Sequence, residues 1–252
     1  MKAMILAAGL GTRLRPLTNA TPKPLLPVAG RPLIVWTLLL LRRAGILEAI
    51  INLHHLGHLI EQELGDGSRL GLRLAYSHEP VILGTGGGIK QVESFFGGEP
   101  FLVVNGDTLF ELDVAKLLAF HNAHGGLATM VLREDREAER WGAVEIDGHR
   151  RVLRITGRGR REDRTAATRM FAGIHVMHPR LLRTVPAGHA SSIIDAYVAE
   201  LQRGESVLGF DLTGYWSDVG TVERYQQVCR DAETGLIDLP SRLDRRASSA
   251  LP

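Results

Sequence analysis

Short apolar runs of strand length alternate with helical segments along the first half of this chain, and this alternation restricts the possible folds most. Lys2–Ala8 (KAMILAA) is a continuous apolar run closed by a glycine, which is typical of a strand buried on both faces of a parallel sheet. The pattern predicts a helix over Leu33–Arg43, with Gly45 behind its end, and a second strand over Ala49–Leu53. Together these elements form a βαβ unit.

The alternation then repeats along the chain. We expect helices at Leu56–Leu64, after Gly88 and at Val114–His124, and strands at Leu72–Tyr76, Phe101–Asn105 and Ala128–Leu132. Elements of these lengths predict an α/β fold with a Rossmann-like, doubly wound and mainly parallel sheet that carries helices on both faces.

The pattern changes after Trp141, where shorter strands predict a smaller antiparallel segment added to the first half. These strands are Ala143–Ile146, Val152–Ile155 and Met170–Met177, and further elements are helices at Leu181–Val185, Ile193–Gln202 and Val222–Arg230 and a strand at Val207–Leu212. The charged stretch Arg158–Arg164 is interpreted as a mobile surface loop. We expect one domain over residues 1–231 and a partly disordered C-terminal tail over residues 232–252.

Composition excludes several classes of protein. The 252 residues are 44% hydrophobic and carry a net charge of +2 without a block of five like charges, so nothing drives non-specific binding to nucleic acid. The longest apolar run, Leu33–Leu41, is shorter than the roughly 20 residues that cross a membrane, and the N-terminus does not resemble a signal peptide. Cys229 is the only cysteine, which fits a reducing compartment. We therefore expect a cytoplasmic protein.

The loop after the first strand combines glycines, prolines and cations. It fails the P-loop pattern, and it also fails the dinucleotide fingerprint because Leu14 stands where the third glycine belongs. Glycines still let backbone N–H groups approach a phosphate, while Arg13 offers a planar fork and Lys23 a compact charge. The loop leaves the carboxyl end of a strand, where open α/β sheets bind ligands, so it indicates a polyphosphate site.

Two aspartates follow predicted strands far apart in the sequence. Asp107 comes directly after Phe101–Asn105 and Gly106, and Asp218 lies between an aromatic pair and Gly220. Each aspartate alone fits a turn or a helix cap equally well. As a pair, they offer the few carboxylates that Mg²⁺ prefers beside phosphate oxygens.

Three histidines, His54, His55 and His58, lie close together in the sequence. Their spacing does not match a zinc motif, and they fall where a strand passes into a helix. We interpret them as solvated or capping residues.

The glycine loop also carries a long resemblance. Leu6–Thr18 (LAAGLGTRLRPLT) and Thr21–Val28 (TPKPLLPV) closely resemble the signature of the sugar-1-phosphate nucleotidylyltransferases. The resemblance, which extends over about Met1–Asp231, implies that the loop grips the β and γ phosphates of a nucleoside triphosphate. By the same resemblance Arg13 and Lys23 are catalytic: Arg13 holds the departing pyrophosphate and Lys23 stabilises charge at the α phosphate.

The resemblance also implies the other members of the site. The family's N-G-D and W-x-D-v-G motifs match Asp107 and Asp218, which would then hold Mg²⁺. The nucleotide would contact Ala8, Gly9, Gly11, Thr12, Arg13, Lys23, Glu79, Gly84, Gly86, Gly87 and Asp107. In the family the stretch Glu79–Gly88 lies against the base, and its three consecutive glycines permit close contact with a flat ligand; a glycine-rich helix start is the alternative interpretation.

The sugar side follows the family less closely. Asn105, Gly142 and Gly173 match positions beside the sugar. Many members carry an E-K-P motif whose lysine holds the sugar phosphate, but this chain has Thr156–Arg160 (TGRGR) there, so an arginine would have to take that role. This departure leaves the identity of the sugar open.

In a chain that lacks E-K-P, the stretches Gly65–Ser68, Leu83–Ile89, Val104–Asp107 and Trp216–Thr221 are most similar to the N-acetylmuramate-1-phosphate uridylyltransferases of cell-wall recycling. The implied reaction joins a nucleoside triphosphate and a sugar 1-phosphate into a nucleotide sugar with release of pyrophosphate. Mannose- or heptose-1-phosphate guanylyltransferases remain an alternative, because Glu79 offers an acceptor for the N1–H and N2–H₂ groups of guanine. A non-catalytic nucleotide-sugar sensor is the alternative from another class.

Overall fold

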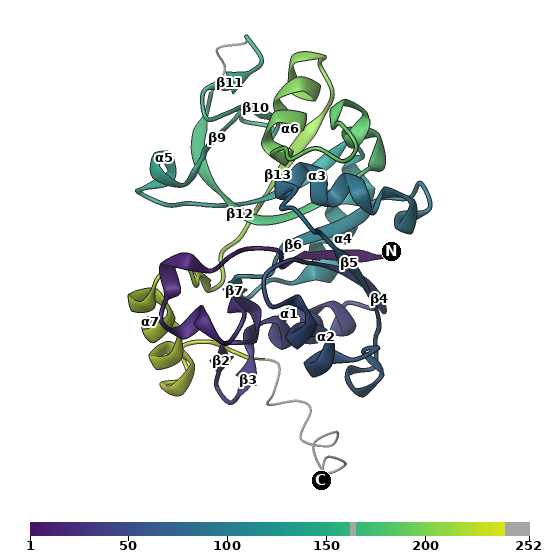
Figure 1. Ribbon diagram of the computed structural model, residues 1–252. Coiled ribbons are helices and arrows are strands. Elements are labelled where there is room, and N and C mark those ends of the chain that lie inside the picture. Colours follow the sequence, from purple (N-terminus) through teal and green to yellow (C-terminus); the bar gives the residue numbers. More distant parts are fainter. Residues whose placement is uncertain (162–164, 240–252) are drawn as a thin grey trace.

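The computed structural model describes residues 1–161 and 165–239, in which ten strands form one central sheet with helices on both faces (Figure 1). Eight of these strands lie in the order β11-β10-β9-β12-β6-β1-β4-β5, while β8 pairs with β12 and β13 pairs with β8. The predicted Rossmann-like α/β fold is confirmed.

The first half of the chain forms the parallel part of the sheet. Its strands are β1 (Ala3–Leu6), β4 (Glu48–Leu53), β5 (Arg73–His78) and β6 (Phe101–Asn105), and its helices are α1 (Leu33–Arg43), α2 (Gly57–Leu64) and α3 (Gly84–Gln91). In the register of this sheet, Leu6 lies opposite Asn52 on one side and Asn105 on the other. Three neighbouring strands thus end at one edge, where polar side chains begin.

The antiparallel strands are not simply added to that half. The long strand β12 (Ala167–Met177) lies next to β6 within the sheet and pairs antiparallel with β6, β8 (Ala128–Arg133) and β9 (Ala143–Ile146). The register of β12 against β8 shifts between Phe171 and His175, a span that contains Gly173 at φ +74°. The antiparallel segment therefore begins at the centre of the sheet, and β10 (Val152–Ile155) and β11 (Arg158–Gly159) complete its edge.

Several predicted boundaries are corrected by the structure. Arg158 and Gly159 pair with β10 instead of starting a loop, and Glu162–Arg164 lie outside the described residues. The helix predicted at Leu181–Val185 is a 3-10 turn over Pro179–Thr184, and α3 begins at Gly84 instead of after Gly88.

The remaining strands and helices complete the fold. They are β2 (Pro27–Val28), β3 (Arg31–Pro32), β7 (Thr108–Phe110), β13 (Val207–Asp211) and β14 (Trp216–Asp218), with α4 (Val114–His124), α5 (Ala138–Trp141), α6 (Ile193–Gln202) and α7 (Val222–Glu233). Helix α7 runs past the predicted domain end, and Ile237 and Leu239 are buried in the core beyond it, while residues 240–252 lie outside the described part.

The core consists of two apolar clusters, one on each face of the sheet. Alternate residues of a strand enter different clusters, so Met4 lies in one cluster with Ile89 of α3 and Tyr197 of α6, whereas Ile5 lies in the other with Trp36 of α1. No helix in the described ranges has the length and apolar character needed to cross a bilayer.

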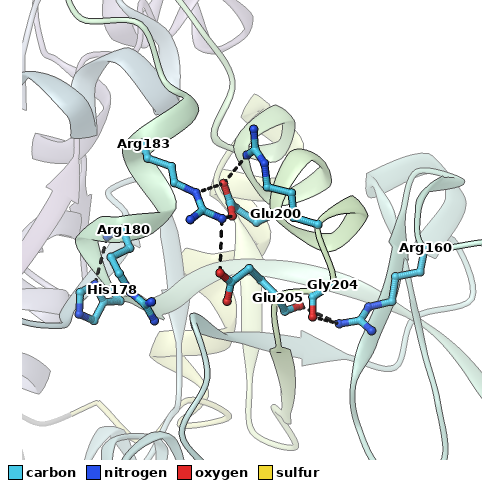
Figure 2. Close-up of polar contacts among 8 residues, drawn as sticks. Arg160, His178, Arg180, Arg183, Glu200, Gly204 and Glu205 are labelled. Carbon is cyan, nitrogen blue, oxygen red and sulfur yellow. Dashed lines mark hydrogen bonds and ion pairs between the residues drawn. The ribbon is translucent and has the colours of Figure 1, made fainter.

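A buried glutamate joins α6 to the elements around it (Figure 2). The side chain of Glu200 is fully buried, and its carboxylate accepts from Arg183, whose Nε lies 3.0 Å from Oε1, and from Arg203, whose Nη1 lies 2.8 Å from the same oxygen. Nearby, Arg160 donates to the carbonyl oxygens of Gly204 and Glu205. The cluster anchors the end of α6 to the 3-10 turn before it and to the β10–β11 edge.

One buried histidine makes stability depend on pH. His175 of β12 lies in the core with its Nδ1 2.6 Å from the hydroxyl oxygen of Tyr197, and burial lowers the pKa of His175 to about 3. Because its unfolded pKa is about 6.5, the unfolded chain binds a proton below that pH while the folded chain does not. Stability is therefore lost as the pH falls below about 6.5.

We predict that protonation of this histidine in the unfolded chain lowers the free energy of unfolding by about 2 kcal/mol when the pH falls from about 7.5 to about 5. Denaturant titrations across this range check the prediction, with His175→Gln expected to show a flatter pH dependence than the unmodified protein. His58→Gln, on the exposed surface of α2, is the control and should leave the slope unchanged. Equal slopes for His175→Gln and the unmodified protein would refute this account.

Candidate active site at the carboxyl edge of the parallel strands

A cavity of about 230 Å³ opens at the carboxyl ends of β1, β4 and β6. It is lined by Leu6, Ala7, Ala8, Gly9, Lys23, Pro24, Asn52, Glu79, Ile82, Gly84, Thr85, Asn105, Gly106 and Asp107. The location agrees with the rule that open α/β sheets bind ligands outside the carboxyl ends of their strands. Seven of the predicted site residues line it: Ala8, Gly9, Lys23, Glu79, Gly84, Asn105 and Asp107.

The glycine loop forms one wall and then folds back on itself. Gly11 takes φ +63°, and a Cβ there would lie 3.1 Å from Cγ2 of Thr18, whose hydroxyl donates to the Gly11 carbonyl at 2.8 Å. Thr12 and Arg13 follow in a 3-10 turn that is anchored by the buried side chain of Leu14. The turn leaves Arg13 exposed beyond the cavity.

Lys23 connects this loop to the edge of the sheet. Only 8% of the residue is exposed, and its Nζ donates to Oδ2 of Asp107 at 2.7 Å. A buried ammonium group needs such a partner, because leaving a charge unpaired in the interior is strongly destabilising. The two predicted residues, 84 positions apart in the sequence, therefore form one charged pair at the mouth of the cavity.

The structure also brings the two predicted metal ligands together. Strands β7 and β14 pair so that Asp218 lies opposite Thr108, and the backbone N–H of Val219 donates to the carbonyl of Asp107 at 2.9 Å. Arg224 of α7 donates to Oδ1 of Asp218 at 3.1 Å.

Arg13 lies near the same aspartate. A Cβ placed on Gly220 would be 2.2 Å from Oδ1 of Asp218 and 3.3 Å from Nη2 of Arg13, so only glycine leaves room there. The predicted pyrophosphate-holding arginine and the second carboxylate thus share one corner of the site.

The chemistry of these carboxylates fits Mg²⁺. Among the described residues no group of three or more His, Cys, Asp and Glu side chains gathers as a metal site, so the predicted ligands in this part of the chain are the two carboxylates of Asp107 and Asp218. Mg²⁺ typically takes one or two carboxylates and completes its octahedron with water and phosphate oxygens. The magnesium site stays a prediction.

A buried polar network lies at the back of the cavity. Asn52, at the end of β4, accepts from the backbone N–H of Ala7 at 2.7 Å and donates through Nδ2 to Oε1 of Glu79 at 2.7 Å. The other oxygen of Glu79 accepts from the backbone N–H of Leu83 at 2.8 Å. Asn52 was not among the site residues predicted from the sequence, although a polar residue inside an otherwise apolar strand is the signal that could have revealed it.

The consecutive glycines have a packing role in the structure, and their expected contact with a flat ligand stays a prediction. Gly86 and Gly87 are buried in the first turns of α3, behind the cavity lining. A Cβ on Gly87 would lie 2.3 Å from the carbonyl oxygen of His189, and the N–H of Gly86 donates to the carbonyl of Ser191 at 2.8 Å. These glycines let α3 approach the backbone of residues 189–192, which explains why the helix begins earlier than predicted.

The predicted sugar residues are only partly brought together. A Cβ on Gly173 would lie 2.4 Å from Nδ2 of Asn105, so these two residues adjoin at the cavity. Gly142, with φ +103°, lies instead near Thr156, and a Cβ there would be 3.9 Å from its Cγ2. Of the arginines in the sequence that replaces E-K-P, Arg158 pairs with Asp195 of α6 at 2.9 Å and Arg160 turns toward the other end of that helix.

The chain is similar to known proteins over most of its length. Residues 2–235 match the family model described as nucleotidyl transferase. N-acetylmuramate alpha-1-phosphate uridylyltransferase of Neisseria meningitidis is 42% identical over 232 residues, which cover 90% of this chain and 96% of the relative. Mannose-1-phosphate guanylyltransferase of Mycobacterium tuberculosis is 33% identical over 241 residues, which cover 95% of this chain and 66% of the relative.

The fold also has a close solved counterpart. A Bacillus anthracis protein described as a glucose-1-phosphate thymidylyltransferase superposes with a TM-score of 0.81 at 26% identity, covering 92% of this chain and 95% of that one.

The packing of α3 generates a prediction about stability. Gly87→Ala places a methyl group against the backbone oxygen of His189, which cannot swing away as a side chain would, so we expect a loss of about 1 to 3 kcal/mol in the free energy of unfolding. Chemical denaturation measures this loss. Gly148→Ala is the matched control, because no heavy atom lies within 4 Å of a Cβ there and its φ is ordinary. Equal stability of the two variants would contradict the assigned packing role.

Proposed function

The chain belongs to the nucleotidyl transferase family and is a sugar-1-phosphate nucleotidyltransferase, and from this premise we propose that its substrates are UTP and N-acetylmuramate 1-phosphate. The observation that carries the proposal is the 42% identity to the uridylyltransferase of Neisseria meningitidis, which extends over 96% of that relative. The product would be a uridine diphosphate sugar used in cell-wall recycling.

The reaction is an in-line transfer at the α phosphorus. A phosphate oxygen of the sugar 1-phosphate forms a bond to this phosphorus while the bond to the oxygen that bridges it to the β phosphorus breaks, and pyrophosphate leaves with that oxygen. Such transfers need little covalent chemistry from the protein and depend on positioning and on stabilisation of charge.

The cations of the loop would provide most of this stabilisation of charge. Lys23 is fixed beside Asp107 at the mouth of the cavity and would meet the negative charge that develops at the α phosphate. Arg13, in the adjacent exposed turn, would hold the departing pyrophosphate together with the backbone N–H groups of Gly9–Thr12. Asp107 and Asp218 would hold Mg²⁺, which offsets the charge of the phosphates.

The hydrogen bonds of Glu79 do not decide between uracil and guanine. Both carboxylate oxygens already accept N–H groups, from Asn52 and from Leu83. Each carboxylate oxygen can accept more than one hydrogen bond, so these contacts do not exclude guanine, and the choice of UTP rests on the 42% identity to the uridylyltransferase. The contact of Glu79 with the base stays a prediction.

Two alternative functions are considered beside this proposal. Use of GTP with mannose or heptose 1-phosphate is favoured by the 33% identity to the guanylyltransferase of Mycobacterium tuberculosis over 95% of this chain. A non-catalytic nucleotide-sugar sensor is disfavoured, because both cations and both carboxylates of the predicted machinery are present at one edge of the sheet.

A cytoplasmic location is supported by the single cysteine.

Release of pyrophosphate across a substrate panel tests the proposal. The panel combines UTP and GTP with N-acetylmuramate, mannose, heptose and glucose 1-phosphates in the presence of Mg²⁺. We expect the highest kcat/KM for UTP with N-acetylmuramate 1-phosphate. A higher value for GTP with mannose or heptose 1-phosphate would overturn the proposed substrates, and tight nucleotide binding without any pyrophosphate would indicate the sensor.

Removal of the buried lysine tests the assigned chemistry. Lys23→Ala deletes one preorganised donor and should lower kcat by about 10²- to 10³-fold, which corresponds to about 3 to 4 kcal/mol of transition-state stabilisation. Lys116→Ala, at an exposed position of α4, is the control and should leave kcat unchanged. A near-normal kcat for Lys23→Ala would remove this lysine from the mechanism.

A further inference from the structure

The Asn52–Glu79 pair is unusual because it is both buried and uncompensated by a cation. The two residues are 3% and 2% exposed. Within residues 1–161 and 165–239, no lysine or arginine forms an ion pair with Glu79, and its carboxylate accepts only N–H groups of an amide and of the backbone. Burial of a carboxylate in such surroundings costs free energy that a pair of apolar side chains would not cost. A stability role alone therefore does not explain the pair.

The pair connects the two sides of the nucleotide cavity. Through the N–H of Ala7 it holds the end of β1, where the glycine loop begins, and through the N–H of Leu83 it holds the segment that enters α3. Both of these segments contribute residues to the cavity lining. Helix α3 is fitted around the pair, because a Cβ on Gly88 would lie 2.6 Å from Oε1 of Glu79 and 3.0 Å from Nδ2 of Asn52.

We propose that Asn52 and Glu79 are positioning residues that hold the phosphate side and the base side of the cavity at the separation a nucleoside triphosphate requires. The inference rests on the proposed function, since it needs a triphosphate in this cavity. Neither residue has to touch the reacting atoms. Their effect is on the binding of the triphosphate, and the sugar phosphate and the transfer step depend on them much less.

The order of donors and acceptors in the network provides a sharp test. Asn52→Asp removes the Nδ2 donor and places two carboxyl groups face to face, with one acceptor opposite another. Glu79→Gln leaves one N–H group facing another, whichever way the two amides are turned. In the double variant Asn52→Asp/Glu79→Gln the new carboxylate at position 52 accepts from Ala7 and from the new amide at position 79, whose oxygen accepts from Leu83. All three hydrogen bonds are then possible again, and in the bond between positions 52 and 79 the donor and the acceptor are exchanged.

The experiment measures kcat and KM for both substrates, together with the equilibrium affinity for the triphosphate without sugar phosphate. We expect each single variant to raise the triphosphate KM and Kd by about tenfold or more, because one buried polar contact is unsatisfied. The KM for the sugar phosphate and kcat should change by less than about threefold. The double variant should return the triphosphate KM and Kd to within about threefold of the unmodified protein.

The control is Asn122→Asp/Glu63→Gln, which makes the same two charge changes at exposed positions of α4 and α2 and should leave every constant unchanged. Unchanged triphosphate KM and Kd in folded single variants would overturn the inference. A double variant that does not fold, or that binds triphosphate as weakly as the single variants, would also overturn it. If the unmodified protein neither binds triphosphate nor releases pyrophosphate, the proposed function itself fails, so the two failures are distinguishable.

Discussion

The ion pair between Lys23 and Asp107 is the interaction on which the geometry of this site most depends. The loop from Gly9 to Gly30 contains only 3-10 turns and a two-residue strand, so it has no regular ladder of hydrogen bonds to define its path. It is fixed by tertiary contacts instead, among them the ion pair of the buried Lys23 with the partly exposed Asp107 and the bond from Trp36 to the carbonyl of Val28 at 3.0 Å. The pair places the ammonium group of the loop beside a carboxylate at the sheet edge and so holds both predicted site residues at the cavity.

The register of the parallel strands explains why the other site residues converge. Leu6 lies between Asn52 and Asn105 in the sheet, so the last residues of three strands end side by side. Apolar residues before this level face the two cores, whereas Asn52 and Asn105 at this level, and Asp107 just beyond it, line the cavity. A shift of one residue in either pairing would exchange the faces of the strand, so the buried cores and the site are defined by the same register.

Local patterns predicted the elements well and their tertiary arrangement less well. The helices at Leu33–Arg43 and Ile193–Gln202 match their predicted limits, because each is rich in apolar residues and is followed by a glycine. Strand β12 was recognised, but its place beside β6 depends on pairing between residues far apart in the sequence. The start of α3 was misplaced because glycine disfavours helices, and contacts with residues 189–192 outweigh that preference. Among site residues, motifs found Lys23 and both aspartates, whereas Asn52 and Arg224 belong to no motif that we identified and emerge only from their hydrogen bonds.

We propose that this edge of the sheet binds a triphosphate for cleavage between its α and β phosphorus atoms. A crystal structure of the protein with Mg²⁺ and a non-hydrolysable UTP analogue tests it most directly. Our account predicts the β and γ phosphates over residues 9–23 and the metal ion between Asp107 and Asp218. Phosphates bound elsewhere on the protein, or an ion distant from both carboxylates, would contradict it.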